Sequence, residues 1–261
     1  MKYPKKSLGQ NFLIDKNIIK KIISLVEIKN KNIVEIGPGK GALTHEIFKL
    51  KPETLTLVEK DFVIAKELGK FFLSNKNVKI FNKDVLKLDL ENLCKKNSVI
   101  FGNLPFNISS QILVKILKFK FLPSNVTDII FMFQKELGEK IIAKFLTSDY
   151  CRLSILTNFR LNILNNFVVS PNCFFPKPKV HSMVIHFQPK KKINFKIKKI
   201  SNLEKVTNII FSNKRKMINK NIKKLLSNKK IKKIIKLDLK ARPSDINPDI
   251  YYKITELYEE D

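Results

Sequence analysis

The tetrapeptide Asn103-Leu104-Pro105-Phe106 follows an apolar run and combines residue types that could position a reacting group. Pro105 has no N–H and cannot continue a central strand, so the strand must end here in a rigid turn. An Asn side-chain oxygen and a backbone carbonyl can together accept both hydrogens of an amino group, which favours the geometry in which its nitrogen attacks a methyl carbon. Phe106 adds a flat face on which a base can stack. The alternative is an ordinary turn, although a turn does not require Phe106.

Three of the chain's seven glycines, Gly37, Gly39 and Gly41, fall close together in "VEIGPGKG". They lie between a strand pattern and a helix pattern, which is where parallel α/β folds bind nucleotide-type ligands. The G-x-G-x-G spacing differs from the dinucleotide motif, and Pro38 removes one amide donor from the loop. The pattern therefore favours a ligand without phosphates, with a purely structural tight turn as the alternative.

Two carboxylates follow at the ends of the next two predicted strands. Glu59 comes about 20 residues after the glycines, where an acid can accept hydrogen bonds from both ribose hydroxyls. Asp84 ends the third strand, where a carboxylate can accept from an adenine amino group. Each acid taken alone could be a solvated strand end. Together they indicate an adenosine ligand with a cationic centre, S-adenosylmethionine rather than NAD.

The elements that must position these residues alternate between strand and helix patterns. Strands are predicted at residues 31–37, 54–59, 78–84, 98–103, 128–134, 161–169 and 180–187. Helices are predicted at residues 42–50, 62–73 and 109–118, preceded by a helix that Asp15 caps. Such alternation predicts an α/β fold with a mostly parallel sheet covered by helices on both faces.

The composition changes after Phe187, because residues 188–240 contain many lysines and almost no acids. The strand pattern also gives way to helical segments, the last of which starts at Asn247 and Pro248. We therefore expect two domains, residues 1–189 with the ligand site and a small basic helical domain of residues 190–261. Within the second domain we expect a contact with RNA phosphates, the alternative being a solvated face, at Lys214, Arg215 and Lys216.

The charge of the whole chain points to a polyanionic partner. Lys and Arg number 51 against 23 Asp and Glu, a net charge of +28, and nucleic acid is the usual partner of such a field. Some of the lysines could instead reflect an AT-rich genome, since Ile and Asn are also abundant.

Other compositional features narrow the class of protein. Cys94, Cys151 and Cys173 are too widely spaced for a disulfide framework or a zinc site. His181 and His186 would lie on opposite faces of a strand, so no metal is expected. The first residues lead into no apolar stretch, and no run is long enough to span a membrane. We expect a cytoplasmic protein without membrane association.

The order of the motifs resembles one family across residues 5 to 255. "SLGQNFLID", "VEIGPGKGALT", "LVEKD", "FGNLPFNIS", "FQKE" and "FFPKPKVHSMVIHF" are similar to the successive motifs of the ribosomal RNA adenine dimethyltransferases. "GQNFL" and the C-terminal "FSNKRKMINKNIKKL" and "ARPSDI" resemble the branch acting on the small subunit. The resemblance implies a Rossmann-like class I methyltransferase domain with a seven-stranded sheet, plus a small all-helical domain.

The resemblance also implies a reaction and a set of site residues. Four methyl groups would pass from S-adenosylmethionine to N6 of two adjacent adenines, in a hairpin loop near the 3′ end of 16S-type ribosomal RNA of the small subunit. The residues that match the family's cofactor contacts are Asn11, Leu13, Gly37, Glu59, Asp84 and Asn103. The implied catalytic turn is Asn103 to Phe106. We expect a monomer without an obligate protein partner.

Two other functions stay open on the sequence. Phe106 stands where the small-subunit enzymes usually have Tyr, whereas the enzymes that methylate large-subunit RNA and confer macrolide resistance often have Phe there. A large-subunit methyltransferase is therefore one alternative. The other is a non-catalytic assembly factor that uses the same fold and its basic surface, against which the intact glycine loop, Glu59, Asp84 and the Asn-Leu-Pro-Phe turn argue.

Overall fold

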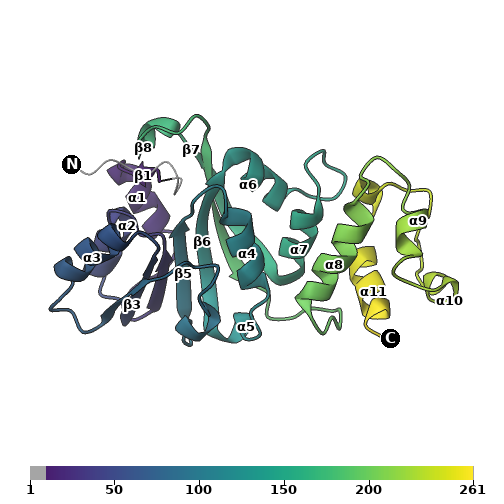
Figure 1. Ribbon diagram of the computed structural model, residues 1–261, viewed down its shortest axis with the longest axis horizontal. Helices are drawn as coiled ribbons and strands as arrows, with labels where there is room; N and C mark the ends of the chain where they lie inside the picture. Colours follow the sequence, from purple (N-terminus) through teal and green to yellow (C-terminus); the bar gives the residue numbers. More distant parts are fainter. Residues whose placement is uncertain (1–9, 261) are drawn as a thin grey trace. The chain divides into compact units, whose positions relative to one another are not determined.

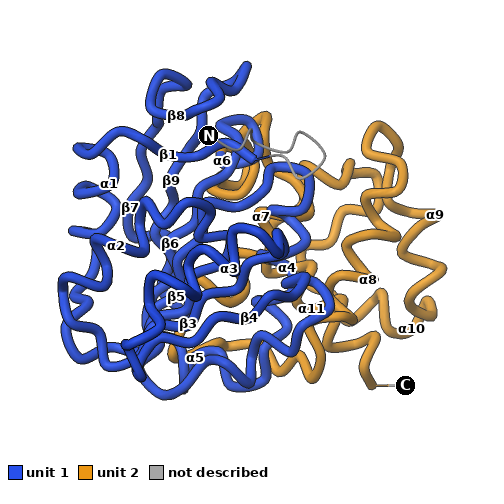
Figure 2. The backbone as a smooth tube through the Cα atoms, turned by 60° about the vertical axis from the view of Figure 1, so that its left-hand side comes forward, with its two compact units in different colours: residues 1–138, 162–189 blue, residues 139–161, 190–261 orange. Residues whose placement is uncertain are grey.

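A computed structural model of the protein describes residues 10–260. The first nine residues, on which the expectation of no secretory signal and the start of "SLGQNFLID" fall, lie outside the described residues. Within the described part of the chain, no helix has the length and apolar character needed to cross a membrane. The chain divides into two compact units, Met1–Gly138 with Asn162–Pro189 and Glu139–Leu161 with Lys190–Asp261 (Figure 2).

The first unit is built on a seven-stranded sheet with the strand order β4-β3-β2-β5-β6-β9-β7 (Figure 1). The strands are β2 (Asn32–Ile36), β3 (Thr54–Glu59), β4 (Val78–Asn82), β5 (Ser98–Asn103), β6 (Val126–Gln134), β7 (Leu161–Val169) and β9 (Ser182–Pro189). The pairs from β4 through β6 are parallel, whereas β6 and β9 are antiparallel. The predicted mostly parallel seven-stranded sheet is confirmed.

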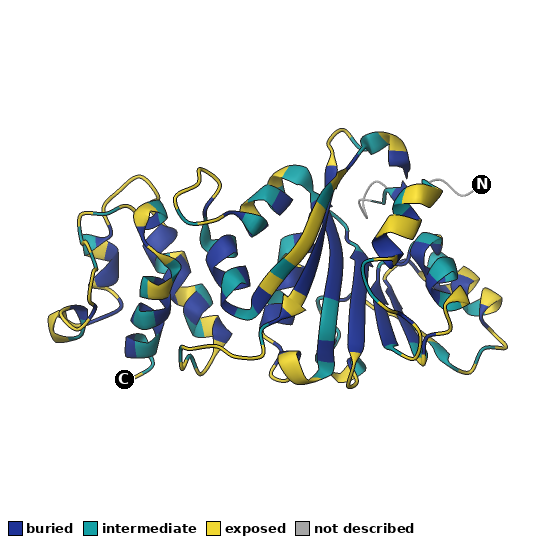
Figure 3. Ribbon diagram, turned by 180° about the vertical axis from the view of Figure 1, so that it is seen from behind, coloured by how far each residue is buried: buried dark blue, intermediate teal, exposed yellow. Residues whose placement is uncertain are grey.

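Burial explains why the central strands are almost continuously apolar. Every residue of β2 is buried, and only Asn103 of β5 is partly exposed, as expected for parallel strands covered on both faces. The middle of the sheet is accordingly mostly dark blue in Figure 3. The covering helices are α1 (Lys16–Ile23), α2 (Ala42–Lys49), α3 (Phe62–Phe71), α4 (Ser109–Leu117) and the short α5 (Leu122–Asn125), whereas α6 (Lys135–Ile142) directly follows β6 and runs from the first unit into the second. Asp15 caps α1, because its Oδ1 accepts from the N–H groups of Asn17 and Ile18.

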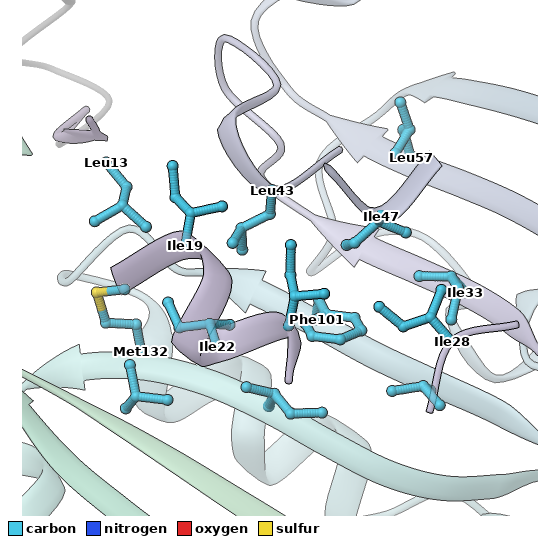
Figure 4. Packing of buried hydrophobic residues seen from close by; sticks show 14 of the residues in the cluster. Leu13, Ile19, Ile22, Ile28, Ile33, Leu43, Ile47, Leu57, Phe101 and Met132 are labelled. Carbon is cyan, nitrogen blue, oxygen red and sulfur yellow. The ribbon is translucent and has the colours of Figure 1, made fainter. Parts of the chain in front are cut away.

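One hydrophobic cluster ties α1 and α2 to the sheet. Ile19 and Ile22 of α1 pack in it with Ile47 of α2, and Ile33 and Phe101 come from β2 and β5 (Figure 4). The cluster fixes the edge of the sheet from which the candidate site residues extend.

A two-stranded ribbon that the sequence did not predict lies beside the main sheet. β1 (Phe12–Leu13) pairs antiparallel with β8 (Phe174–Phe175), with Phe12 opposite Phe175 and Leu13 opposite Phe174 (Figure 1). Strands of two residues carry no detectable periodicity, because alternation needs about four residues to show. The ribbon holds the segment around Asn11 against the rest of the first unit.

The second unit is helical, and it contains residues that the predicted domain boundary placed elsewhere. Its helices are α7 (Arg152–Arg160), α8 (Ile200–Phe211), α9 (Asn219–Ile222), α10 (Asn228–Ile231) and α11 (Pro248–Tyr258). The boundary between residues 189 and 190 was expected to leave residues 139–161 in the first domain, whereas they group with the C-terminal helices. The reason is packing: the Tyr252 hydroxyl donates to the carbonyl of Ile155 at 3.0 Å, and the rings of Phe159 and Tyr252 lie 4.9 Å apart.

Candidate functional site

One cleft in the first unit gathers the residues that follow the parallel strands. It is lined by residues 10–13, 35–40, 42–43, 58–60, 83–86 and 103–108. The structure therefore brings together all the predicted cofactor residues and the whole predicted catalytic turn, namely Asn11, Leu13, Gly37, Glu59, Asp84, Asn103, Leu104, Pro105 and Phe106. The carboxyl ends of parallel strands are the edge where such sheets bind ligands.

The backbone of the glycine loop, residues 37–41, forms part of the wall of this cleft. Gly37 and Gly39 have φ angles of +67° and +55°, a left-handed region that side chains rarely adopt. A Cβ at Gly39 would lie 2.9 Å from the Phe12 ring, and one at Gly37 would lie 3.5 Å from the carbonyl oxygen of Asn103. The loop thus leaves no room for a side chain at Gly39, and Gly37 keeps the wall beside Asn103 open.

Glu59 is held at the end of β3 with its acceptor capacity partly used. Its side chain is 7 % exposed; Oε1 accepts from the Asp61 N–H at 2.8 Å, and Oε2 accepts from the Gly39 N–H at 3.2 Å. Burial raises the pKa of Glu59, whereas these two backbone donors lower it. Each carboxylate oxygen can accept a second hydrogen bond, so Glu59 has the capacity to accept from a vicinal diol.

Asp84 lines the same cleft in a different environment. Its Oδ2 accepts from Lys60 Nζ at 2.9 Å, and its Oδ1 accepts from the Leu86 N–H at 2.9 Å. The hydrogen bond from Lys60 holds the pKa of Asp84 below its usual value. The carboxylate is therefore ionised at neutral pH and able to accept from an amino group. Sequence reasoning missed Lys60, whose one signal was its place directly after Glu59.

The Asn103 amide is oriented by a residue 92 positions away. Its Nδ2 donates to the backbone carbonyl of Asn11 at 3.1 Å, so the amide NH₂ is engaged and Oδ1 is left as the acceptor. The turn after it is braced, because the carbonyl of Pro105 accepts from the Ile108 N–H at 3.1 Å and the carbonyl of Phe106 accepts from the Ser109 hydroxyl at 3.1 Å. The structure thus contains an amide oxygen fixed beside a half-buried aromatic side chain.

Glu35 is a lining residue that sequence reasoning missed. It lies within β2, is 2 % exposed, and its Oε2 accepts from the Thr44 hydroxyl at 2.7 Å. Burial is the main cause that raises the pKa of Glu35 to about 7; the Thr44 hydrogen bond opposes this shift and the nearby charge of Glu59 adds to it. The available signal was an acid among the apolar residues of "IVEI", which an expected buried strand does not explain.

The predicted RNA contacts are not part of the cleft. Lys214, Arg215 and Lys216 are exposed and lie in the turn between α8 and α9 of the second unit. Within residues 10–260 no three His, Cys, Asp or Glu side chains gather into a possible metal site.

Comparison with solved structures gives the class of the fold. A dimethyladenosine transferase from Plasmodium falciparum is 24% identical, with a TM-score of 0.75 over 93% of this chain and 95% of that one. The 23S rRNA methyltransferase ErmE is 20% identical, with a TM-score of 0.67 over 95% of this chain and all of that one. These likenesses show the Rossmann-like fold that methyltransferases of this class share, which confirms the predicted fold class.

Comparison of sequences gives the family. The model of the ribosomal RNA adenine dimethylases matches residues 1–260, and the chain belongs to that family. The ribosomal RNA small subunit methyltransferase A of Pelagibacter ubique (strain HTCC1062) is 43% identical, over 98% of this chain and 97% of that protein. The protein of the same name from Malacoplasma penetrans (strain HF-2) is 39% identical, over 97% and 91%. The predicted family is confirmed, and with it a methyltransferase dependent on S-adenosylmethionine.

Proposed function

We propose that the protein dimethylates N6 of two adjacent adenines in the 3′-terminal hairpin loop of small-subunit ribosomal RNA. The observation that carries the proposal is the Asn103 amide, which the Asn11 carbonyl orients inside the cleft that Glu59 and Asp84 also line. The names of the relatives at 43% and 39% identity support the small subunit as the target. ErmE, whose name specifies 23S RNA, is similar at 20% identity, which supports the fold alone.

The cleft fits S-adenosylmethionine as the methyl donor. Phe12 packs on the Gly39 backbone and presents its ring to the cleft, and Glu59 retains lone pairs for ribose hydroxyls. Asp84 accepts from the adenine amino group, while Asn11, Leu13 and Gly37 complete the wall. The chemistry supplied by the bound donor is a methyl group activated by a sulfonium charge.

The residues of the turn position the amino group of the target adenine. Oδ1 of Asn103 accepts one N–H, and the carbonyl of Leu104 accepts the other, since the carbonyl of Pro105 is already engaged by Ile108. Both hydrogen bonds draw the nitrogen's lone pair out of conjugation with the ring and aim it at the methyl carbon. Phe106 stacks on the flipped base. After transfer the alkylated nitrogen releases its proton to water, so positioning supplies most of the rate.

Phe106 offers a direct test of the stacking role. Phe106→Ala should lower kcat/KM for methylation of small subunits roughly 5- to 100-fold, because stacking on an aromatic side chain contributes about 1–3 kcal/mol per base. Phe106→Tyr keeps the ring and should stay close to the parent enzyme. Steady-state rates at limiting subunit concentration would measure both. If alanine performs as well as phenylalanine, the ring only fills space.

We also propose that Lys214, Arg215 and Lys216 hold RNA by its phosphates. Replacing all three with alanine should weaken binding to small subunits and lower the slope of log affinity against log salt by up to about 0.9 per lost duplex phosphate contact. Filter binding over a range of salt concentrations would measure the slope. A matched triple variant at the exposed Lys95, Lys96 and Lys120 of the first unit removes the same charge. Equal slopes in the two triple variants would make the 214–216 turn a solvated face.

The target itself can be tested by labelled methyl transfer to unmethylated small and large ribosomal subunits, with the modified nucleotides mapped. We expect dimethyladenine in small-subunit RNA alone. Its appearance in large-subunit RNA would identify a resistance-type enzyme, and labelling of neither subunit would indicate a non-catalytic factor.

We further propose that the protein is cytoplasmic. We also propose that it works as a monomer without an obligate protein partner, because one chain supplies all the residues that line the cleft.

A further inference from the structure

The β1–β8 ribbon has two chemically different faces. In an antiparallel pair, directly opposite residues lie on the same face, and neighbours along a strand lie on opposite faces. Leu13 and Phe174 are opposite each other, and both are buried in the hydrophobic cluster of the first unit. Phe12 and Phe175 therefore share the other face of the ribbon.

The face that carries Phe12 and Phe175 is continuous with the cleft. Phe12 lines the cleft and is 9 % exposed, whereas Phe175 is 54 % exposed. Directly opposite residues have Cβ atoms about 5 Å apart, so Phe175 extends the wall of the cleft beyond Phe12 and into solvent. The ring of Phe175 is not needed for the core, since Phe174 occupies that side of the ribbon.

The surroundings of Phe175 are positively charged. Lys177 and Lys179 follow in the same loop and are exposed, and Lys40 Nζ lies 5.1 Å from the centre of the Phe12 ring. The sequence contains no Asp or Glu between Asp149 and Glu204. Exposed aromatic side chains beside lysines are typical of surfaces that bind single-stranded nucleic acid.

We propose that Phe175 stacks on the base of a nucleotide next to the target adenine, while Lys177 and Lys179 contact the adjoining phosphates. This inference rests on the proposed function, because it takes the RNA strand that carries the target as the occupant. Phe106 holds the flipped base inside the cleft, and Phe175 holds the unflipped neighbour at the rim. Phe106 and Phe175 therefore contact two neighbouring bases of the same RNA strand.

The first test is binding. Phe175→Ala should weaken binding of unmethylated small subunits roughly fivefold or more, because the stacking face is lost. Phe175→Tyr keeps an aromatic ring and should bind as tightly as the parent. Phe121→Ala is the matched control: Phe121 is 51 % exposed, and it precedes α5 and β6, at the amino edge of the sheet. S-adenosylmethionine affinity should be unchanged in both alanine variants, which separates an RNA effect from damage to the cofactor wall. Equal binding by the two alanine variants would overturn the proposal.

The second test locates the contact. Phe175→p-azidophenylalanine, irradiated in the complex of the full chain with small subunits, should crosslink to a nucleotide adjacent to the methylated adenines. A crosslink to a ribosomal protein, to distant RNA or to nothing would overturn the proposal. If the parent enzyme methylates the small subunit in these preparations, such a result would reject the role of Phe175 alone. If it does not, the proposed function itself fails.

Discussion

Replacing Asn103 with alanine should lower the single-turnover rate of methyl transfer by roughly 10² or more, as loss of one preorganised polar contact does in other enzymes. The physical reason is that Oδ1 is the acceptor that the Asn11 carbonyl leaves available, and alanine offers no atom to replace it. Affinity for S-adenosylmethionine should stay within a few-fold, because Glu59 and Asp84 are untouched. Rapid-quench measurements on saturating small subunits would give the rate, and calorimetry would give the cofactor affinity.

Two further variants sharpen the Asn103 test. Asn165→Ala changes the same residue type at an exposed position of β7, outside the residues that line the cleft, and it should leave the saturated rate near that of the parent. Asn103→Asp keeps an oxygen acceptor but cannot donate to the Asn11 carbonyl, so the carboxylate loses its orientation and its rate should also fall. A near-parent rate in Asn103→Ala would reject the assigned role.

Glu35 should make the free protein less stable as the pH rises. The pKa of its carboxyl is raised from 4.5 to about 7 by burial, so the folded state binds a proton more tightly than the unfolded state does. The stability that this proton contributes is complete below about pH 4.5, is lost as the pH rises towards 7, and is absent above. At 1.36 kcal/mol per pKa unit, the total loss from this group is about 3 kcal/mol.

Glu35→Gln removes the titrating group and keeps an oxygen that can accept from the Thr44 hydroxyl. The free energy of unfolding of the variant, relative to the parent, should therefore increase by about 3 kcal/mol between acidic and mildly alkaline pH. Urea denaturation at a series of pH values would measure the difference. Glu67→Gln, at an exposed position on α3, is the control without burial. A difference between Glu35→Gln and the parent that does not change with pH would show that Glu35 is ionised in the folded protein throughout this range.

The sheet and the cleft could be predicted because their signals are local. Parallel strands buried on both faces are continuous apolar runs, and the glycines, Glu59, Asp84 and the Asn103 turn each follow such a run directly. Topology alone then brings the strand ends to one edge. What escaped prediction depends on contacts that leave no local pattern, namely the two-residue strands of the ribbon and the packing of residues 139–161 with α11.

The electrostatic environment of the site also lay beyond the sequence. The pKa of Glu35 follows from complete burial beside Glu59, and that of Asp84 follows from the ion pair with Lys60. Neither neighbour is implied by spacing, because the same acids on an exposed strand end would titrate normally. The direction of the Asn103 amide likewise depends on Asn11, which no periodicity connects to it.

The ribbon also determines when, during synthesis, this protein can become active. The segment that carries Asn11 is held by hydrogen-bonded partners far along the chain: the Ile14 N–H donates to the carbonyl of Cys173 at 2.8 Å, and Phe12 pairs with Phe175. Contacts of such sequence separation form late, since the intervening chain must first be made and folded. A nascent chain that ends before β8 can build most of the sheet but lacks the strand that holds Phe12 and Leu13 beside the cleft. We therefore expect the nascent chain to gain activity only after β8 has been translated.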